Sequence, residues 1–261
     1  MASKKSLPIS GTLTVMVIVV VLAPSALLDQ TAEFKAAFMK KCTEYPKDKK
    51  TCEATLAIFE RAYVGKKQTD VTEDSYNELF DNTPFTHPCE KTMLWSGTNY
   101  LAHKLSEKRD NFFNVADTLL GNVLNKLIWC GKAGSKETFT TDKDCPYTEP
   151  NPTGSFWFKI SARFAQFACG NINLLLKGEN LIPFDPRSVL ATHEIPNLQT
   201  GKVEKVTVIL VVDKKTGTKC KNDSLNNLSN ILKGKKIGYD CKEVTQTHIE
   251  DCIDRGIKDC F

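Results

Sequence analysis

All ten cysteines of this 261-residue chain follow an N-terminal segment of the kind that directs proteins into the secretory pathway. Lys4 and Lys5 precede an apolar run at residues 13–22, and the small residues Ala23 and Ser25 come after it. We therefore expect residues 1–28 to be a cleaved signal peptide. The alternative is an uncleaved type II signal-anchor, because residues 9–28 reach about the minimum length that spans a membrane.

In either case the chain enters a compartment where disulfides persist, so the even number of cysteines predicts a disulfide-stabilised fold. Close spacing favours local bridges for eight cysteines, and a long-range bridge takes the two that are left. The predicted pairs are Cys42–Cys52, Cys130–Cys145, Cys220–Cys241, Cys252–Cys260 and Cys89–Cys169. Spacing alone does not fix this connectivity, because ten cysteines allow on the order of a thousand pairings.

The composition narrows the classes of partner. With 41% hydrophobic and 25% charged residues, the chain has the composition of a globular protein. Its 35 basic and 31 acidic residues are spread along the length without a basic block, so no nucleic-acid partner is predicted. The four histidines stand in no Cys/His cluster with ligand spacing, so no metal is predicted. Asn222 and Asn227 begin glycosylation sequons, and membrane contact is expected only through the leader.

The first half of the chain has helical periodicity. Apolar residues recur at helical spacing near Phe34 and near Phe59, and Thr72 begins another helix. Further apolar faces run over residues 119–128 and from Phe156 through residue 172, where Ser155 would cap a long helix that ends near residues 177–178. These helices need one another to bury their apolar faces.

The second half is richer in β-branched residues. Residues 203–212 form the clearest predicted strand, residues 92–94 and 237–239 are shorter candidates, and residues 225–232 suggest an amphipathic helix. Alternation of strands and helices predicts an α/β (mixed) fold with a small, mainly parallel sheet flanked by helices. We expect a helical lobe (29–88 plus 114–168) packed on an α/β lobe (89–113 plus 169–261), with an active cleft between them.

Each tryptophan lies in a short run that includes small or polar residues, and Glu194 stands in an unusual loop sequence. If residues 92–95 are a strand, Trp95 is at its carboxyl end, where open α/β sheets place a ligand crevice. Ser96 would begin a turn whose backbone amides can bind a phosphate. Two aromatic rings and a carboxylate can bind a flat cationic ring, with an acid group beside the reacting carbon.

Taken together, these runs resemble the ADP-ribosyl cyclase family over residues 34–261. The matching fragments, in family order, are Met93-Leu94-Trp95-Ser96-Gly97, Asp117-Thr118-Leu119-Leu120-Gly121, Trp129-Cys130-Gly131, Ser155-Phe156-Trp157, Arg163-Phe164-Ala165 and His193-Glu194-Ile195-Pro196-Asn197-Leu198. The resemblance implies an extracellular NAD glycohydrolase and cyclase that makes ADP-ribose and cyclic ADP-ribose. It implies no cofactor, since NAD is the substrate. It leaves open whether the chain also accepts NADP or nicotinic acid and whether it forms a homodimer.

The resemblance also assigns roles. Glu194 matches the catalytic glutamate, Trp95 and Trp157 match the two tryptophans of the site, and Ser161 matches a serine near the ribose or phosphates. Ser96 is the expected phosphate contact. Asp117 is either a contact in the site or a cap for the helix after it.

Some residues are interpreted as structural. Trp129 is expected in the core because an apolar run and Cys130 flank it. His103 and His193 are expected to be hydrogen-bonded structural residues rather than catalytic bases.

The chain departs from the family pattern at two places. Ala116 stands where many members have a glutamate that contacts nicotinamide or adenine, so we expect a different ratio of hydrolysis to cyclisation. Both halves of one family disulfide are missing, since Thr69 stands at its first position and no cysteine lies between Cys145 and Cys169. Losing a whole bridge leaves no odd thiol, which supports pairing Cys89 with Cys169.

Two other classes of function compete with the enzyme. One is a catalytically idle receptor or adhesion ectodomain on the same scaffold, for which Ala116 and the extracellular setting are the arguments. The other is a disulfide-rich structural or carrier protein that does not bind NAD. The presence of Glu194 counts against both.

Overall fold

The structure is a computed structural model that describes residues 30–45, 49–84, 87–146, 150–257 and 261. The leader predicted at residues 1–28 lies outside these ranges. Among the described helices, none has the length and apolar character that crossing a bilayer requires.

In chain order, the elements are α1 (Gln30–Glu44), α2 (Lys49–Tyr63), η1 (Gln68–Asp70), η2 (Glu73–Tyr76), α3 (Asn77–Asn82), β1 (Met93–Ser96), α4 (Asn99–Lys108), η3 (Val115–Asp117), α5 (Leu119–Leu124), α6 (Pro152–Gln166), β2 (Gly170–Lys177), η4 (Leu190–Glu194), α7 (Ile195–Asn197), β3 (Val203–Val212), η5 (Lys219–Lys221), α8 (Asp223–Gly234), β4 (Gly238–Thr245) and α9 (Gln246–Arg255). The η4 segment is a π-helix, and the other η segments are 3₁₀-helices.

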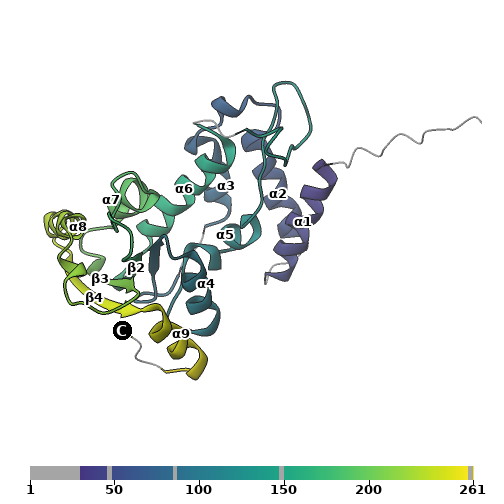
Figure 1. Cartoon of the computed structure of the whole chain (residues 1–261). Coiled ribbons are helices and arrows are strands. Elements are labelled where there is room, and N and C mark those ends of the chain that lie inside the picture. The colour runs from purple at the N-terminus through teal and green to yellow at the C-terminus, as the bar shows by residue number, and fades with distance from the viewer. Residues whose placement is uncertain (1–29, 46–48, 85–86, 147–149, 258–260) are drawn as a thin grey trace, which may run out of the picture.

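Helices α1, α2, α3 and α5 gather at one end of the molecule, and α6 runs from them toward the sheet (Figure 1). They pack through an aromatic cluster centred on Phe59, whose ring lies 5.1 Å from that of Trp129 and 6.2 Å from that of Phe156. Such edge-on aromatic pairs add to the free energy gained from burying the rings. The helices predicted near Phe34 and Phe59, and the start at Thr72, are confirmed.

The sheet has the order β1-β2-β3-β4, and each neighbouring pair in the described residues is parallel. Alternate side chains of its strands enter two different clusters: Leu174 and Leu176 pack with α6 and α8, whereas Leu175 packs with α4 and α9. Both faces are therefore covered, as parallel sheets require. The α/β fold class is confirmed, including the strand at residues 203–212. The division into two lobes stays a prediction, and one cluster of buried side chains continues from the helices to the sheet.

The long helix predicted after Ser155 was wrong at both ends. Asn151 caps α6 and accepts a hydrogen bond from the Gly154 amide, whereas the Ser155 hydroxyl donates to the Val71 carbonyl. The helix ends at Gln166, and the apolar residues beyond Gly170 form β2. Gly170 has a φ of +70°, which favours glycine and stops the helix from continuing. Buried strands and buried helices have similar apolar runs, so periodicity did not separate them.

The helix predicted over residues 119–128 is also shorter, because α5 ends at Leu124. Lys126 has a left-handed φ of 63°, and Ile128 is exposed rather than packed in the core. Residues other than glycine rarely adopt such a backbone, and it is not compatible with a continuing helix. The chain therefore leaves the helix here, and residues 125–128 are free to line a cavity.

Four of the predicted disulfides are confirmed: Cys42–Cys52, Cys89–Cys169, Cys130–Cys145 and Cys220–Cys241. The long-range bridge joins the segment before β1 to the residue before β2, so it ties together two neighbouring strands of the sheet. Cys252 is buried on α9, and its predicted partner Cys260 lies outside the described residues. That pairing stays a prediction.

Candidate active site

A cavity of about 590 Å³ lies where β1, α4, η3, α6 and η4 meet. Five of the predicted site residues line it: Trp95, Ser96, Trp157, Ser161 and Glu194. They come from three segments that are separated by about sixty and about thirty residues in the sequence. A cavity of this size suits a small organic ligand.

The end of β1 supplies Trp95 and Ser96, both half-buried. Gly97 follows with a φ of +74°, which favours glycine, and the Thr98 hydroxyl donates to the Leu175 carbonyl at 3.0 Å to hold the turn against β2. Helix α4 starts at Asn99, three residues after the end of β1, so the free backbone amides of its first turn lie close to that strand end. This is the strand–turn–helix arrangement that the sequence predicted, and such amides can bind an anionic group.

Helix α6 supplies Trp157 and Ser161, which are four residues apart and so lie on one face. Trp157 is half-buried, and its ring packs edge-on against Phe156 at 5.4 Å. Phe156 is itself fully buried in the aromatic cluster. The core thus orients the Trp157 ring while one side of that ring remains available to the cavity.

Glu194 ends the π-helix η4 and leads directly into α7. The wide turn of a π-helix displaces side chains from their usual positions and occurs often at functional sites. Here Leu190 and Ile195 are buried around Glu194, and the glutamate side chain itself is only 7% exposed. A carboxylate so deep in the protein is uncommon unless a partner or a function retains it.

The Glu194 carboxyl has one hydrogen-bond partner, the Ser161 hydroxyl, and its Oε2 atom is buried with no partner among the described residues. Burial raises the pKa of Glu194 to about 7, and the bond from Ser161 opposes this shift. The group is therefore divided between its two protonation states near neutral pH. When ionised, it can stabilise positive charge that develops on a ligand beside it.

A family model described as ADP-ribosyl cyclase matches residues 31–260 of this chain. The chain belongs to the ADP-ribosyl cyclase family. The ADP-ribosyl cyclase/cyclic ADP-ribose hydrolase of Aplysia kurodai is 33% identical over 239 residues, which cover 85% of this chain and 83% of that protein.

Solved structures of the family have the same fold. Porcine CD38, in a complex with a covalent intermediate, has a TM-score of 0.75 and 30% identity, covering 84% of this chain and 98% of that one. Aplysia cyclase in complex with its substrate NGD and its product cGDPR has a TM-score of 0.72 and 27% identity, covering 86% and 94%.

The part of the cavity lining that η3 supplies is uncharged. Val115 and Ala116 line the cavity there, and the Ala116 side chain carries no group that can contact a base by charge or hydrogen bond. The titratable side chains that line the cavity are His103, Lys126 and Glu194. Among the described residues that line the cavity, Glu194 is the one acidic group.

Asp117 does not line this cavity, although η3 does. Its carboxylate accepts hydrogen bonds from the Asn114 amide at 2.7 Å and from the Ser106 hydroxyl at 3.1 Å, and burial raises its pKa. The expectation that Asp117 caps the following helix was wrong, because Thr118 caps α5 by accepting from the Gly121 amide. The Asp117 carboxylate instead completes the capping box of η3 by accepting from the amide of Asn114. Its contact with substrate stays a prediction.

Trp129 is 1% exposed, and its Nε1 donates to the Tyr76 hydroxyl at 3.0 Å, so its structural interpretation is confirmed. Sequence reasoning missed Lys126 and the residues beside it as part of the cavity, because they were assigned to a helix. It also gave His103 no place there, although His103 lies one turn along α4 from the strand end and its ring is 6.4 Å from that of Trp95. That spacing was visible in the sequence.

Proposed function

We propose that this chain cleaves the bond between nicotinamide and ribose in NAD and forms ADP-ribose and cyclic ADP-ribose. The observation that carries the proposal is the buried Glu194 carboxyl, whose Oε2 has no partner among the described residues, in a cavity lined by Trp95 and Trp157. Membership of the ADP-ribosyl cyclase family supports it. The half-buried indoles can stack on the cationic nicotinamide ring, each contact contributing about 0.5–2 kcal/mol.

In the proposed reaction the glycosidic bond breaks and its electron pair goes to the ring nitrogen of nicotinamide, which leaves as a neutral molecule. Positive charge then develops on the ribose, and the Glu194 carboxylate stabilises it, as carboxylates do in glycoside hydrolysis. Attack by water at the same carbon releases a proton and gives ADP-ribose. Attack by a nitrogen of the adenine ring in the same molecule gives cyclic ADP-ribose.

This role of Glu194 requires its ionised form. Because burial raises the pKa of Glu194 to about 7, kcat/KM for NAD should fall as the pH drops below about 7. Initial rates of nicotinamide release between pH 3.5 and pH 9 measure this. A half-maximum near the ordinary value of 4.5 would show that the carboxyl is not held in the environment described above.

The uncharged wall at Ala116 is proposed to set the product ratio. Ala116→Glu should change the proportion of cyclic ADP-ribose to ADP-ribose, because an added carboxylate can bind the base that remains in the cavity, while total nicotinamide release persists. Chromatographic product profiles from NAD measure this, and Ala116→Gln is the control with a side chain of the same size and no charge. Identical product profiles for the wild type and both variants would show that residue 116 does not set the product ratio. Absence of any nicotinamide release from folded protein would favour an idle receptor scaffold.

The chain is proposed to act in the secretory pathway or outside the cell, either secreted or held by an uncleaved leader. The confirmed disulfides support this setting. Of the two sequon asparagines, Asn227 is exposed on α8, whereas the Asn222 amide donates to the Leu181 carbonyl and its oxygen caps α8. We therefore propose Asn227 as the glycosylated residue, because a glycan there would break fewer protein hydrogen bonds than one at Asn222. The leader boundary and a homodimer stay predictions.

A further inference from the structure

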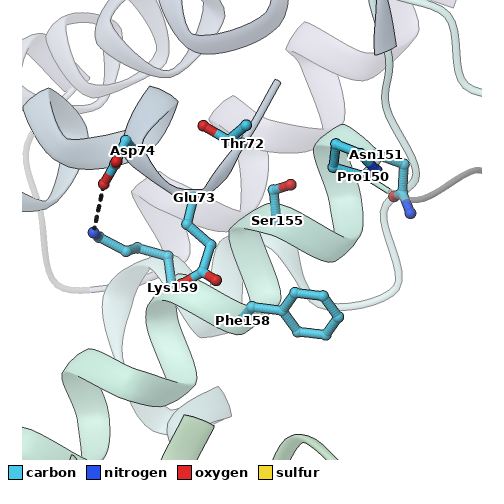
Figure 2. Close-up of a pocket in the computed structure, with 8 residues that line it drawn as sticks. All are labelled: Thr72, Glu73, Asp74, Pro150, Asn151, Ser155, Phe158 and Lys159. Carbon is cyan, nitrogen blue, oxygen red and sulfur yellow. Dashed lines mark hydrogen bonds and ion pairs between the residues drawn. The ribbon is translucent and has the colours of Figure 1, made fainter. Parts of the chain in front are cut away.

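Figure 2 shows a second cavity, of about 650 Å³, which is lined by residues of η2, of α6 and of the chain just before each. Its α6 residues are Ser155, Phe158 and Lys159, whereas α6 lines the candidate active site with Trp157 and Ser161.

The polar groups of the second cavity already have protein partners. Lys159 and Asp74 form an ion pair at 3.5 Å, which Figure 2 shows as a dashed line, and Ser155 and Asn151 bond to backbone groups. The ion pair joins η2 to α6, and the other two contacts lie within α6 or join it to Val71. The cavity therefore offers few unpaired groups to a ligand of its own.

Two residues of this second cavity, Glu73 and Phe158, hold a residue of the π-helix. The His193 ring is stacked on the Phe158 ring, with centroids 4.5 Å apart and an interplanar angle of 15°. Its Nε2 lies 3.2 Å from Glu73 Oε1, and its Nδ1 lies 2.8 Å from the Thr192 hydroxyl. An ionised carboxylate can only accept, so Nε2 carries the proton that is donated to Glu73.

The backbone of His193 is held as well. Asn197 Nδ2 donates to the His193 carbonyl at 2.8 Å, and Gln166 at the end of α6 donates to Asn197 Oδ1 at 2.9 Å. Both the ring and the carbonyl of His193 are therefore tied to α6, directly or through one residue. Glu194 is the next residue along the same turn.

Glu194 has little of its own to fix its side chain. The Ser161 hydroxyl is its one hydrogen-bond partner among the described residues. Its position follows the backbone of the turn that carries it, and the contacts of His193 are among those that hold this turn. A displacement of about 1 Å at a reacting group can cost a hundredfold in rate.

We propose that His193, held by Glu73 and Phe158, is a positioning residue that directs the Glu194 carboxyl into the candidate active site. This inference rests on the proposed function, because it concerns the same reaction. It gives His193 a task that sequence reasoning did not assign, since the sequence predicted only a hydrogen-bonded structural histidine.

The test uses the full chain and measures kcat and KM for nicotinamide release from NAD. Glu73→Ala should lower kcat about tenfold and leave KM within about twofold, because Glu73 does not line the substrate cavity. Glu73→Gln keeps an acceptor for His193 Nε2 and should retain most of the kcat. Asp74→Ala is the matched control, because it removes an ion pair of the same 3₁₀-helix without touching His193, and its kcat should equal that of the wild type.

A double variant separates positioning from general loss of structure. If Glu73 acts through His193, then His193→Ala combined with Glu73→Ala should lower kcat no more than His193→Ala alone. Phe158→Leu, which removes the stacked ring, should lower kcat in the same direction and serves as a second variant if His193→Ala does not fold.

The inference is overturned if Glu73→Ala matches Asp74→Ala in kcat, if Glu73→Gln loses as much kcat as Glu73→Ala, or if the change is confined to KM. The wild type and Glu194→Gln, assayed in parallel, distinguish a failure of the proposed function from a failure of the positioning role of His193. Absence of nicotinamide release by the folded wild type contradicts the proposed function itself, and full activity in Glu194→Gln contradicts the role of Glu194 in it. Loss of activity in Glu194→Gln together with an unaffected Glu73→Ala contradicts only the positioning role of His193.

Discussion

Glu194→Gln is expected to lower the rate of nicotinamide release from NAD by about a hundredfold to a thousandfold. This is the usual loss when one preorganised group that stabilises transition-state charge is removed from a water-poor site. The glutamine keeps the size of the side chain and an oxygen that can accept from Ser161, so the change removes the negative charge rather than the packing. Single-turnover and steady-state rates should fall together, because the lost interaction belongs to the transition state.

The same substitution should make the folded protein more resistant to heat at neutral and alkaline pH. The folded-state pKa of Glu194 is about 7 and its ordinary value is 4.5, so the folded state holds its proton more tightly than the unfolded state. The contribution of this group to stability is present below pH 4.5 and is lost as the pH rises through 7. The Tm advantage of Glu194→Gln should therefore grow between pH 4 and pH 8.

Calorimetry or circular dichroism at a series of pH values measures this advantage. A Tm difference that does not change with pH would contradict the raised pKa, whatever the activity of the variant. Ser161→Ala is a useful control, because it removes the hydroxyl that favours the ionised form and leaves the carboxyl in place.

The residues of the candidate site were predictable because three separate signals agreed. Trp95 stands at the end of an apolar strand, Trp157 follows a helix start, and Glu194 precedes a proline turn, each in family order. The family resemblance assigned these residues to one site, but periodicity alone did not show how their segments come together, because one strand of the sheet, β2, was missed. That strand lies between β1 and β3 and fixes their spacing, and it was assigned to a helix. The error arose because Leu174, Leu175 and Leu176 are buried on both faces of the sheet.

The local conformation of Glu194 was also beyond sequence reasoning. A π-helix depends on tertiary contacts rather than on intrinsic propensity, and those of Leu190–Glu194 include contacts from η2, α6 and α7. Without them Glu194 was placed in a loop, where a carboxylate is usually solvated. Its burial and its raised pKa follow from the contacts and not from the residues beside it in the sequence.

Replacement by alanine should affect stability at one tryptophan of this chain and NAD binding at another. Trp129→Ala should lower the free energy of unfolding by about 3–5 kcal/mol, because Trp129 is fully buried and its removal leaves a cavity among Phe34, Phe59 and Phe156. Such a loss corresponds to a fall in Tm of roughly 10 °C or more. Trp129→Phe is the matched control, since it keeps an aromatic ring and loses the bond to Tyr76, whose hydroxyl still donates to the Pro152 carbonyl.

Trp157→Ala should instead leave the protein folded and raise KM for NAD about tenfold, since a stacking contact of roughly 1.4 kcal/mol corresponds to that factor. Trp157 is half-buried, so the loss of packing is smaller than at Trp129. It also lines the cavity, where its ring can contact a ligand. Thermal melts and NAD kinetics on both variants separate the two roles. The assignment of Trp157 to the site would be contradicted if Trp157→Ala melts at as low a temperature as Trp129→Ala, or if it binds NAD as well as the wild type does. In either case the half-buried indole would have no role distinct from that of the buried one.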